Sequence, residues 1–307
     1  MVKLNFISAE VFMSYNKLYL APLFPLLLAT VFSKAAEKEP AKDQLTIMSF
    51  NIRRKGKEKG PDRLWQNRLP LIKELLEEAN PDIIGFQEVT KKQREDLMHT
   101  LPNNFKYVGT GRGASWAGLG TDEATPIFYN TEKFELKEHE TYQLNKASMW
   151  KWMRKRNEYG YLPRICTWAN FTLKDSDKQL YVFNTHLDHK SEKARLNQLK
   201  NILKKTEAIT DCPVFIMGDF NTDLVEPIQK ELSNHNYVNT KEETVHRSGP
   251  KETYTGWQDE PEKLIDHILV KNGKNNKSLR ITKYEVIKKE DSAFPSDHRP
   301  VLIQVSL

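Results

Sequence analysis

The sequence predicts an α/β fold: one large domain in which two layers of β-sheet are covered by helices on the outside. Apolar stretches of strand length alternate along the chain with stretches whose apolar residues recur every three or four positions, the spacing of one helix face. No internal repeat and no Gly/Ser-rich linker interrupts this alternation after residue 44. The 307 residues are 38% hydrophobic and 29% charged, which supplies a sizeable core and excludes a disordered chain.

Charge and cysteine content set further limits. Lys and Arg (47) exceed Asp and Glu (41), which gives a net charge of +6, but the two signs are interleaved along the chain. A mildly positive field suits an anionic substrate and equally an ordinary lysine-rich surface. The two cysteines, Cys166 and Cys212, cannot form a disulfide scaffold or a four-cysteine zinc site, and we expect both to be buried thiols.

The N-terminal residues have the pattern of a secretory signal. Residues 18–32 are uncharged and largely apolar, Lys17 precedes them, and the segment 33–36, SKAA, places small residues where a signal peptidase cleaves. The apolar run is shorter than the roughly 20 residues of a membrane-spanning helix, and Pro22 and Pro25 interrupt it.

We therefore expect residues 1–36 to be a signal peptide and the protein to be secreted or extracytoplasmic. Met13 is an alternative start, because a leader that begins there has a charged region of more usual length. An uncleaved anchor, or an apolar segment docked on the domain, is the alternative to export. Residues 37–44 then form a polar connector, and residues 45–307 form the domain.

The first part of the domain alternates strands and helices. Residues 45–52 are expected to form a buried strand. A helix follows, in which apolar residues at steps of three and four lie on one face: Trp65, Leu69, Ile72, Leu76 and Ala79. Pro70 predicts that this helix starts or bends there. A short buried strand at 83–86 and a helix at 91–101 come next.

The rest of the domain is mostly strands. Five are expected before the next helix, at 107–109, 126–129, 134–144, 164–173 and 180–186. The longest helix is predicted at 191–210, with Ser191 as its N-cap. Four more strands complete the pattern, at 214–217, 267–270, 279–287 and 301–305.

Polar side chains suited to catalysis lie at the ends of these predicted strands. They are Asn51, Glu88, His186, Asp219, Asn221, Asp297 and His298. Each alone has a local explanation, such as capping a helix or closing a turn. Together they are expected to form one site, because strand ends place polar residues at the rim of a sheet, where several strands contribute.

The residue types indicate phosphate-ester chemistry. Glu88, Asp297 and Asn51 offer the hard oxygen ligands that Mg²⁺ or Mn²⁺ prefers. The segment 219–221 and the two histidines can orient and deprotonate a water molecule. Hydrolysis of a phosphate ester needs both a cation that neutralises the non-bridging oxygens and an activated nucleophile. Arg164, at the start of a predicted strand, can bind phosphate with two hydrogen bonds.

The order of the motifs resembles a known family. SFNIR, FQEV, PRICTW, NTHLDH, GDFN, IDHIL and SDHRPV follow one another as in the endonuclease/exonuclease/phosphatase superfamily. That group includes pancreatic deoxyribonuclease, abasic-site endonucleases, inositol polyphosphate 5-phosphatases and bacterial neutral sphingomyelinases. The resemblance runs from about residue 45 to residue 307. It implies a four-layer sandwich, in which two mixed β-sheets pack face to face with helices on the outer faces.

The resemblance also implies a metal and a nucleophile. Glu88 would ligate a Mg²⁺ ion, with Mn²⁺ as a possible substitute and with Asn51 and Asp297 nearby. Asp219 would orient or activate the attacking water, and Asn221 would hold a phosphoryl oxygen.

The remaining motif residues match the acid and the phosphate contacts of the family. His298 would be the second acid/base group, and Asp266 would fix its tautomer. His186 and Arg164 would bind the phosphate. His267 stands where many members have Tyr, and we interpret it as a packing change and not as a ligand.

Two alternatives belong to other classes. His186, Asp188 and His189 match half of the HxHxDH motif of zinc hydrolases of the metallo-β-lactamase type, but Asn184 stands where its first histidine should be. Asp188 and His189 then become loop residues before a helix. A non-catalytic binding homologue is the other alternative, against which the intact acid/base set argues.

The core motifs leave the substrate open. A phosphodiesterase of nuclease type is favoured, and a phosphomonoesterase or a sphingomyelinase-like lipid phosphodiesterase is the alternative. A nucleic acid or a membrane lipid headgroup can therefore be the partner, and no feature points to an obligate protein partner. Selectivity is expected from two rim loops. Residues 53–59 are basic, and residues 146–161 carry Trp150 and Trp152 among cations, which suits stacking or a lipid interface but also a buried satellite cluster.

Overall fold

The computed structural model describes residues 44–307, apart from residue 57 and the segments 114–121, 146–148, 259–262, 275–278 and 290–292. The predicted signal peptide, and the polar connector up to residue 43, lie outside the described residues. All described residues belong to one unit of the chain, Pro40–Leu307. Among them, no helix combines the length and the apolar character needed to cross a bilayer.

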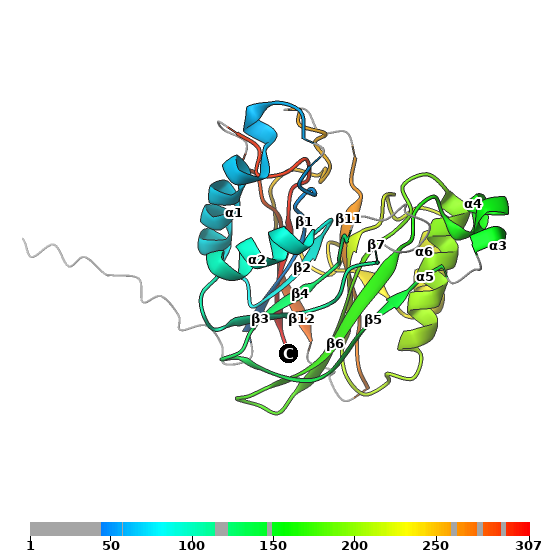
Figure 1. Ribbon diagram of the computed structural model, residues 1–307. Helices are drawn as coiled ribbons and strands as arrows, with labels where there is room; N and C mark the ends of the chain where they lie inside the picture. The colour runs from blue at the N-terminus through cyan, green and yellow to red at the C-terminus, as the bar shows by residue number, and fades with distance from the viewer. Residues whose placement is uncertain are drawn as a thin grey trace, which may run out of the picture. The chain divides into compact units, whose positions relative to one another are not determined.

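A seven-stranded mixed sheet forms one inner layer (Figure 1). Its strands in spatial order are β10 (Arg247–Ser248), β12 (Arg280–Val286), β13 (Val301–Ser306), β1 (Gln44–Asn51), β2 (Ile83–Gln87), β4 (Ile127–Asn130) and β3 (Phe105–Val108). The central strands β1 and β2 are parallel, whereas β13 runs antiparallel to β1 and β4 antiparallel to β2.

A six-stranded mixed sheet forms the second inner layer. Its strands in spatial order are β5 (Phe134–Gln143), β6 (Ile165–Leu173), β7 (Gln179–His186), β8 (Val214–Asp219), β11 (Asp266–Lys271) and β9 (Val238–Asn239). Only β7 and β8 are parallel neighbours in this sheet, and β11 runs antiparallel to β8.

The helices lie outside the two sheets. They are η1 (Pro61–Arg63), α1 (Trp65–Ala79), α2 (Lys91–Thr100), α3 (Met149–Arg154), α4 (Arg156–Tyr159), α5 (Glu192–Thr206) and α6 (Ile228–Asn234). Helices α1 and α2 pack on the seven-stranded sheet, and α5 and α6 pack on the six-stranded sheet (Figure 1). The predicted four-layer sandwich is therefore confirmed.

The alternation of side chains along each strand builds the layers. In β1, Ile47 faces the core between the sheets, while Met48 and Phe50 face α1. In β8, Phe215 faces the same central core, while Ile216 faces α5. Both faces of these strands are buried, so their sequences are largely apolar along the whole strand. Burying each of these large side chains contributes about 1.5–3 kcal/mol to the stability of the fold.

Local signals explain where the helices begin. The Thr90 side chain accepts a hydrogen bond from the backbone N–H of Gln93, and the Gln93 side chain accepts one from the backbone N–H of Thr90, which forms a capping box at α2. Ser191 caps α5 by accepting a hydrogen bond from the backbone of Ala194, as predicted.

Several predicted boundaries were wrong. Helix α1 begins at Trp65 and contains Pro70, so of the two predictions for Pro70, a start or a bend, the start is wrong. Helix α5 ends at Thr206, four residues before the predicted end at 210. The predicted rim loop 146–161 contains α3 and α4, and its Glu158 pairs with Lys193 of α5. The short elements η1, α6, β9 and β10 were not predicted, because each is too short to show a periodic pattern.

The two sheets approach closely at one place. A Cβ added to Gly85 of β2 would lie 2.5 Å from Cε of Met217 in β8 and 2.9 Å from Cγ of Asn184 in β7. Beside it, Gln87 donates a hydrogen bond to Oδ1 of Asn184 at 2.8 Å, and Asn184 donates in turn to the Phe86 carbonyl oxygen at 2.8 Å. These bonds cross from one sheet to the other, and they fix the relative position of the strand ends.

Candidate active site

The site lies at one end of the sandwich, which we call the polar end: β1, β2, β7 and β8 finish there and β11 begins there. Register brings three of the predicted residues into a row, since His186 pairs with Asp219 across β7 and β8, and Asp219 pairs with Asp266 across β8 and β11. Asn51 ends β1 in the other sheet. Both sheets therefore supply side chains to the same end.

Asn51 joins the two halves of the site. Its Nδ2 atom donates a hydrogen bond to Oδ2 of Asp219 at 3.0 Å and lies 3.5 Å from Nε2 of His298. Its Oδ1 atom accepts a hydrogen bond from the backbone N–H of Arg53 at 3.0 Å. Asn51 is fully buried, so this amide is held by its partners and not by solvent.

His298 and Asp266 form a buried pair. Nδ1 of His298 lies 2.9 Å from Oδ2 of Asp266, and Nε2 of the same ring lies 3.7 Å from Oδ2 of Asp219. Burial opposes the charge on the imidazole, but the carboxylates of Asp266 and Asp219 outweigh burial and raise the pKa of His298 to about 10. The ring therefore carries a proton at neutral pH.

Asp219 is held from several directions. Oδ1 accepts a hydrogen bond from the Asn221 backbone N–H at 2.8 Å, and Oδ2 lies 3.3 Å from Nε2 of His186. Burial and the neighbouring Asp266 carboxylate raise the pKa of Asp219 to about 7. Burial and the charge of Arg164 lower the pKa of His186 well below its ordinary value, which keeps that imidazole neutral.

Glu88 and Asp297 both form ion pairs with the guanidinium of Arg53. Arg53 approaches Oε2 of Glu88 with Nη1 at 3.6 Å and Oδ2 of Asp297 with Nε at 3.6 Å. Arg53 and Glu88 both have positive backbone φ angles, +54° and +61°, which turn the chain sharply after β1 and after β2. Glu88 follows β2 and Asp297 precedes β13, so the two carboxylates approach the Arg53 guanidinium from the two sides of β1.

A second group of donors is close enough to hold a metal ion in the described part of the chain. It consists of Asp219, Asp266 and His298, whose donor atoms lie within 4.8 Å of one another. The sequence assigned these residues to proton transfer and the metal to Asn51, Glu88 and Asp297. The 2.9 Å bond from His298 to Oδ2 of Asp266 suits an acid/base pair, while Oδ1 of Asp266 is buried without a hydrogen-bond partner among the described residues.

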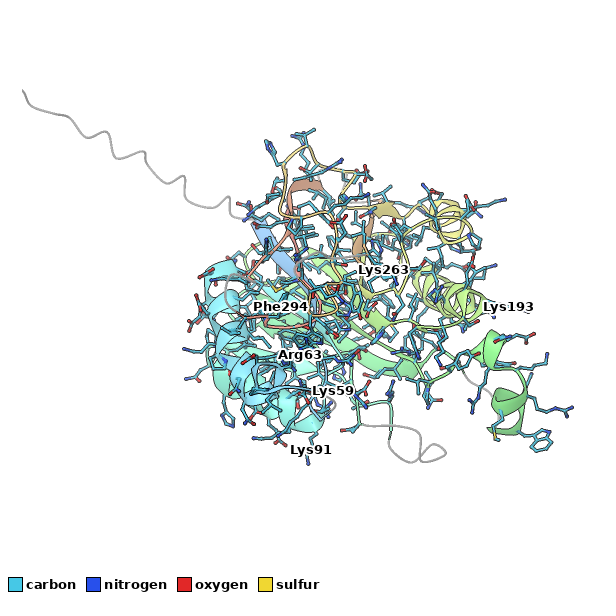
Figure 2. All side chains as sticks on the ribbon, turned by 90° about the horizontal axis from the view of Figure 1, so that it is seen from above. Lys59, Arg63, Lys91, Lys193, Lys263 and Phe294 are labelled. Atoms are coloured by element: carbon cyan, nitrogen blue, oxygen red, sulfur yellow. The ribbon has the colours of Figure 1, made fainter. Side chains whose placement is uncertain are left out.

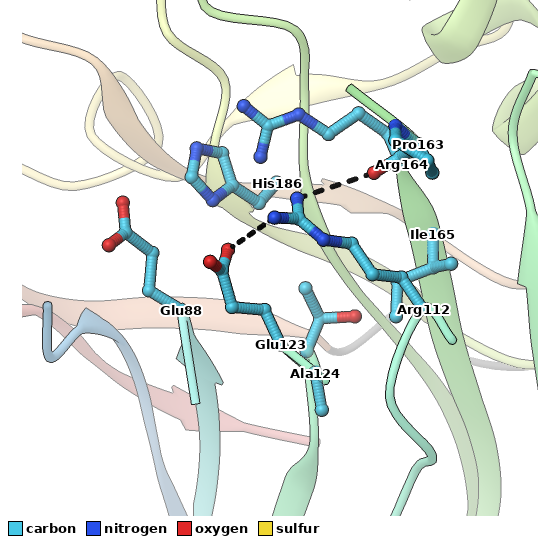
Figure 3. Close-up of a pocket in the computed structure, with 9 residues that line it drawn as sticks. Glu88, Arg112, Glu123, Ala124, Pro163, Arg164, Ile165 and His186 are labelled. Carbon is cyan, nitrogen blue, oxygen red and sulfur yellow. Dashed lines mark hydrogen bonds and ion pairs between the residues drawn. The ribbon is translucent and has the colours of Figure 1, made fainter. Parts of the chain in front are cut away.

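Two arginines line a small pocket beside this site (Figure 3). Arg112 and Arg164 both reach toward His186, and Glu88 and Glu123 complete the wall. Arg112 forms an ion pair with Glu123 at 3.0 Å through Nη2. The sequence predicted Arg164 but missed Arg112 and Glu123. The only signal available was the pair of glycines that flank Arg112, which indicate close backbone approach but no chemistry.

Arg68 is a third residue that the sequence did not predict. It lies inside α1 and is fully buried. Its guanidinium donates hydrogen bonds to the carbonyl oxygens of Ile52 at 2.6 Å, Pro295 at 2.9 Å and Arg53 at 3.0 Å. It therefore ties the loop after β1 to the loop before β13, which carries Asp297 and His298. Helical spacing places Arg68 on the apolar face of α1, three positions after Trp65 and four before Ile72.

Other predicted residues have structural roles. The Asp188 carboxylate accepts hydrogen bonds from the backbone N–H groups of Tyr161, Lys190 and Ser191, so it organises the start of α5. His267 is buried, and its Nε2 lies 3.0 Å from the Thr222 carbonyl oxygen, which agrees with a packing role.

The cysteines differ from each other. Both Cys166 and Cys212 are free thiols. Cys166 is buried as expected, whereas Cys212 is partly exposed because it lies in the turn before β8.

The rim carries basic side chains on both sides. Lys59, Arg63 and Lys91 lie on the side of α1 and α2, and Lys193 lies across from them on α5 (Figure 2). In the predicted aromatic segment, the Trp150 side chain is 70% exposed, so the buried-cluster alternative is wrong for this residue. The side chain of Trp152 lies outside what the structure describes.

Comparisons with known proteins identify the family of the chain. The sequence profile of the Endonuclease/Exonuclease/phosphatase family matches residues 48–298. The uncharacterized protein L388 of Acanthamoeba polyphaga mimivirus is 30% identical over 256 residues, which cover 78% of this chain and 91% of that protein.

Solved structures of similar proteins share the fold. A mannosyl-6-phosphatase of Bacteroides thetaiotaomicron has 28% identity and a TM-score of 0.71, and the match covers 86% of this chain and all of that chain. An endonuclease/exonuclease/phosphatase protein of Bacteroides vulgatus has 25% identity and a TM-score of 0.74, with 87% of this chain and all of that chain covered. The chain belongs to the endonuclease/exonuclease/phosphatase family.

Proposed function

We propose that this protein hydrolyses phosphate esters with the help of a divalent metal ion. The observation that carries the proposal is the position of Asn51, whose amide contacts both Asp219 and His298. A carboxylate with a pKa near neutrality, which Asn51 orients, and a protonated imidazole, which Asp266 holds, lie a few ångströms apart. Such a pair can remove a proton from one oxygen and supply a proton to another.

The residues around Arg53 fit a hard metal ion. Glu88 and Asp297 supply carboxylate oxygens that already face one cation, and Oδ1 of Asn51 points to the same loop. These are the oxygen donors that Mg²⁺ selects, with Mn²⁺ as an alternative. A bound ion would neutralise the charge that develops on the phosphoryl oxygens.

The protein's own side chains supply the rest of the reaction. Asp219 accepts a proton from the attacking water, and His298 donates its proton to the leaving oxygen. The Asn221 backbone and the Asn51 amide each donate to one oxygen of Asp219, which fixes the plane of that carboxylate. His186 stays neutral beside Asp219 and can donate a hydrogen bond without adding charge.

Two ester classes fit this chemistry. The motifs favour a phosphodiester, as in a nuclease. The similarity to a mannosyl-6-phosphatase favours a phosphomonoester, and the arginine pocket supports that second class. A lipid with a phosphodiester headgroup belongs to the phosphodiester class.

A substrate panel tests the proposal. Purified protein with Mg²⁺ or Mn²⁺ is assayed on plasmid DNA, RNA, sphingomyelin, inositol phosphates, sugar phosphates and bis-p-nitrophenyl phosphate. We expect hydrolysis of at least one class that stops with excess EDTA and in the Asp219→Asn variant. The proposal fails if the folded protein with its metal turns over none of them.

We also propose that the protein is exported. The proposal is supported by the apolar run at 18–32 and the small residues at 33–36. Mass spectrometry of protein expressed in an exporting host should find the mature N-terminus near Ala36 or Glu37. Protein that keeps residue 1 and stays in the cytosol would contradict export.

A further inference from the structure

We propose that Arg112, together with Arg164, binds the terminal oxygens of a phosphomonoester and makes the protein a phosphomonoesterase. This inference rests on the phosphoesterase function proposed above and names its substrate class. It concerns the small pocket of Figure 3, which adjoins His186 and Glu88 and therefore opens beside the reacting group.

The charges around the pocket favour an anion, because with Arg54 its arginines outnumber its two carboxylates, Glu88 and Glu123, by one. Glu123 is paired with two arginines, since Arg54 contacts Oε1 and Arg112 contacts Oε2 at 3.0 Å. This group of three therefore has a net charge of +1. All three side chains are at least 85% buried, so water screens their charge only weakly.

Arg164 adds a second cation to the same wall. Its residue is 4% exposed, and its Nε atom has no hydrogen-bond partner. Nη2 lies 3.4 Å from Nδ1 of His189, whose pKa is lowered by burial and by Arg164 itself, so this contact is with a neutral ring. A buried guanidinium with an unsatisfied donor is costly, and an anionic ligand would satisfy it.

The two ester classes differ in what they present to such a wall. A phosphomonoester near neutral pH carries close to two negative charges and three terminal oxygens. A phosphodiester carries one charge and two such oxygens. Its second ester group stays attached to phosphorus and needs room to extend out of the site. The wall beside His186 is closed by the buried side chains of Arg112, Glu123 and Arg164, so it suits oxygens and not a second ester arm.

Hydrolysis then follows the proposed chemistry. The oxygen of water forms a bond to phosphorus while the ester P–O bond breaks. The water proton passes to Asp219, and the leaving oxygen takes a proton from His298. The products are an alcohol and inorganic phosphate, and Arg112 contacts the terminal oxygens throughout.

Two chromogenic esters distinguish the classes. We expect the wild-type protein with Mg²⁺ to hydrolyse p-nitrophenyl phosphate with a higher kcat/KM than bis-p-nitrophenyl phosphate. Arg112→Gln should lower kcat/KM for the monoester by about 10- to 100-fold, the range expected for lost charge-assisted hydrogen bonds. Its effect on kcat/KM for the diester should be several-fold smaller, and Arg112→Lys should recover part of the loss on the monoester.

A matched control separates binding from packing. Arg94 is buried to a similar degree and pairs with Asp122, the residue before Glu123, at 2.9 Å, but it does not line the pocket. Arg94→Gln should therefore not change the ratio of the two activities. Inhibition of the wild type by inorganic phosphate gives a measurement that needs no variant, and its inhibition constant should rise about tenfold or more in Arg112→Gln.

The outcomes are distinct. A wild type that prefers the diester overturns the inference, as does an Arg112→Gln variant that loses both activities equally or retains the wild-type inhibition by phosphate. If neither ester is hydrolysed with Mg²⁺ or Mn²⁺ while the other substrates of the panel are, the inference fails and the proposed function stands. If no ester of any class is hydrolysed, the proposed function itself fails.

Discussion

Asn51 and Asp219 come from different sheets, and the 3.0 Å hydrogen bond from Nδ2 of Asn51 to Oδ2 of Asp219 joins those sheets at the polar end. The same amide lies 3.5 Å from His298, which precedes β13 in the sheet of Asn51. The geometry of the proposed base and acid therefore depends on how the two sheets are packed.

Asn51→Ala should lower kcat by about 10²-fold, because Asp219 loses the donor that orients it. The Asn51 hydrogen bond stabilises the charged form of Asp219 and lowers its pKa, so its removal should raise that pKa further above the ordinary carboxyl range. The acid limb of the pH–rate profile should move to higher pH. A profile unchanged in shape and position would show that Asn51 does not act through Asp219.

Asp266→Asn should shift the alkaline limb of the same profile. The Asp266 carboxylate favours the imidazolium form of His298 and helps to raise its pKa to about 10, so removing that charge lowers the pH at which His298 loses its proton. Activity should then decline at lower pH than in the wild type. His298→Ala should cost more, about 10²-fold in kcat at all pH values. The assignment is wrong if Asp266→Asn is the more damaging of the two.

Arg68→Gln should destabilise the fold by about 3 kcal/mol, because three buried carbonyl oxygens lose charged donors. Urea unfolding of the protein measures this. Arg63→Gln is a suitable control, since Arg63 is partly exposed and contacts the Trp257 ring at 5.3 Å. Equal midpoints for the two variants would contradict the role given to Arg68.

Glu88→Gln should strongly reduce the stabilisation that we expect Mg²⁺ to give to the folded protein. A ligand that binds only the native state raises its stability by about 2.7 kcal/mol at 100 times its Kd. The melting temperature of the wild type should therefore rise with Mg²⁺ concentration, and that of Glu88→Gln should rise much less. A variant that responds to Mg²⁺ as the wild type does would remove Glu88 from the proposed metal site.

The strand-end residues could be predicted because the sheets impose a simple rule. An apolar run followed by Asp219 or preceded by Asp297 places that carboxylate at the rim whatever the rest of the fold does. The spacing also predicted α1 and α5, in which long apolar faces repeat. The sequence could not predict that His186, Asp219 and Asp266 form one row, since that depends on the register between strands.

The missed residues act through tertiary contacts. Arg112 and Glu123 are 11 positions apart and meet only because their segments come together beside the pocket. Arg68 has the spacing of the apolar face of α1, but the spacing does not reveal that the loops at 52–53 and 295 fold over it and accept its hydrogen bonds. The segment 146–161 was predicted as a loop, because α3 and α4 are too short for periodicity to reveal them.

The most direct test of the account is the Mg²⁺-dependent hydrolysis of p-nitrophenyl phosphate by the wild type and by Asp219→Asn. Both proteins are assayed with Mg²⁺ and with excess EDTA, and their melting temperatures are compared. We predict turnover by the wild type that EDTA abolishes, and a loss of about 10²-fold or more in kcat for Asp219→Asn at an unchanged fold. Full activity in EDTA, or equal turnover by a folded Asp219→Asn, would contradict the central claim.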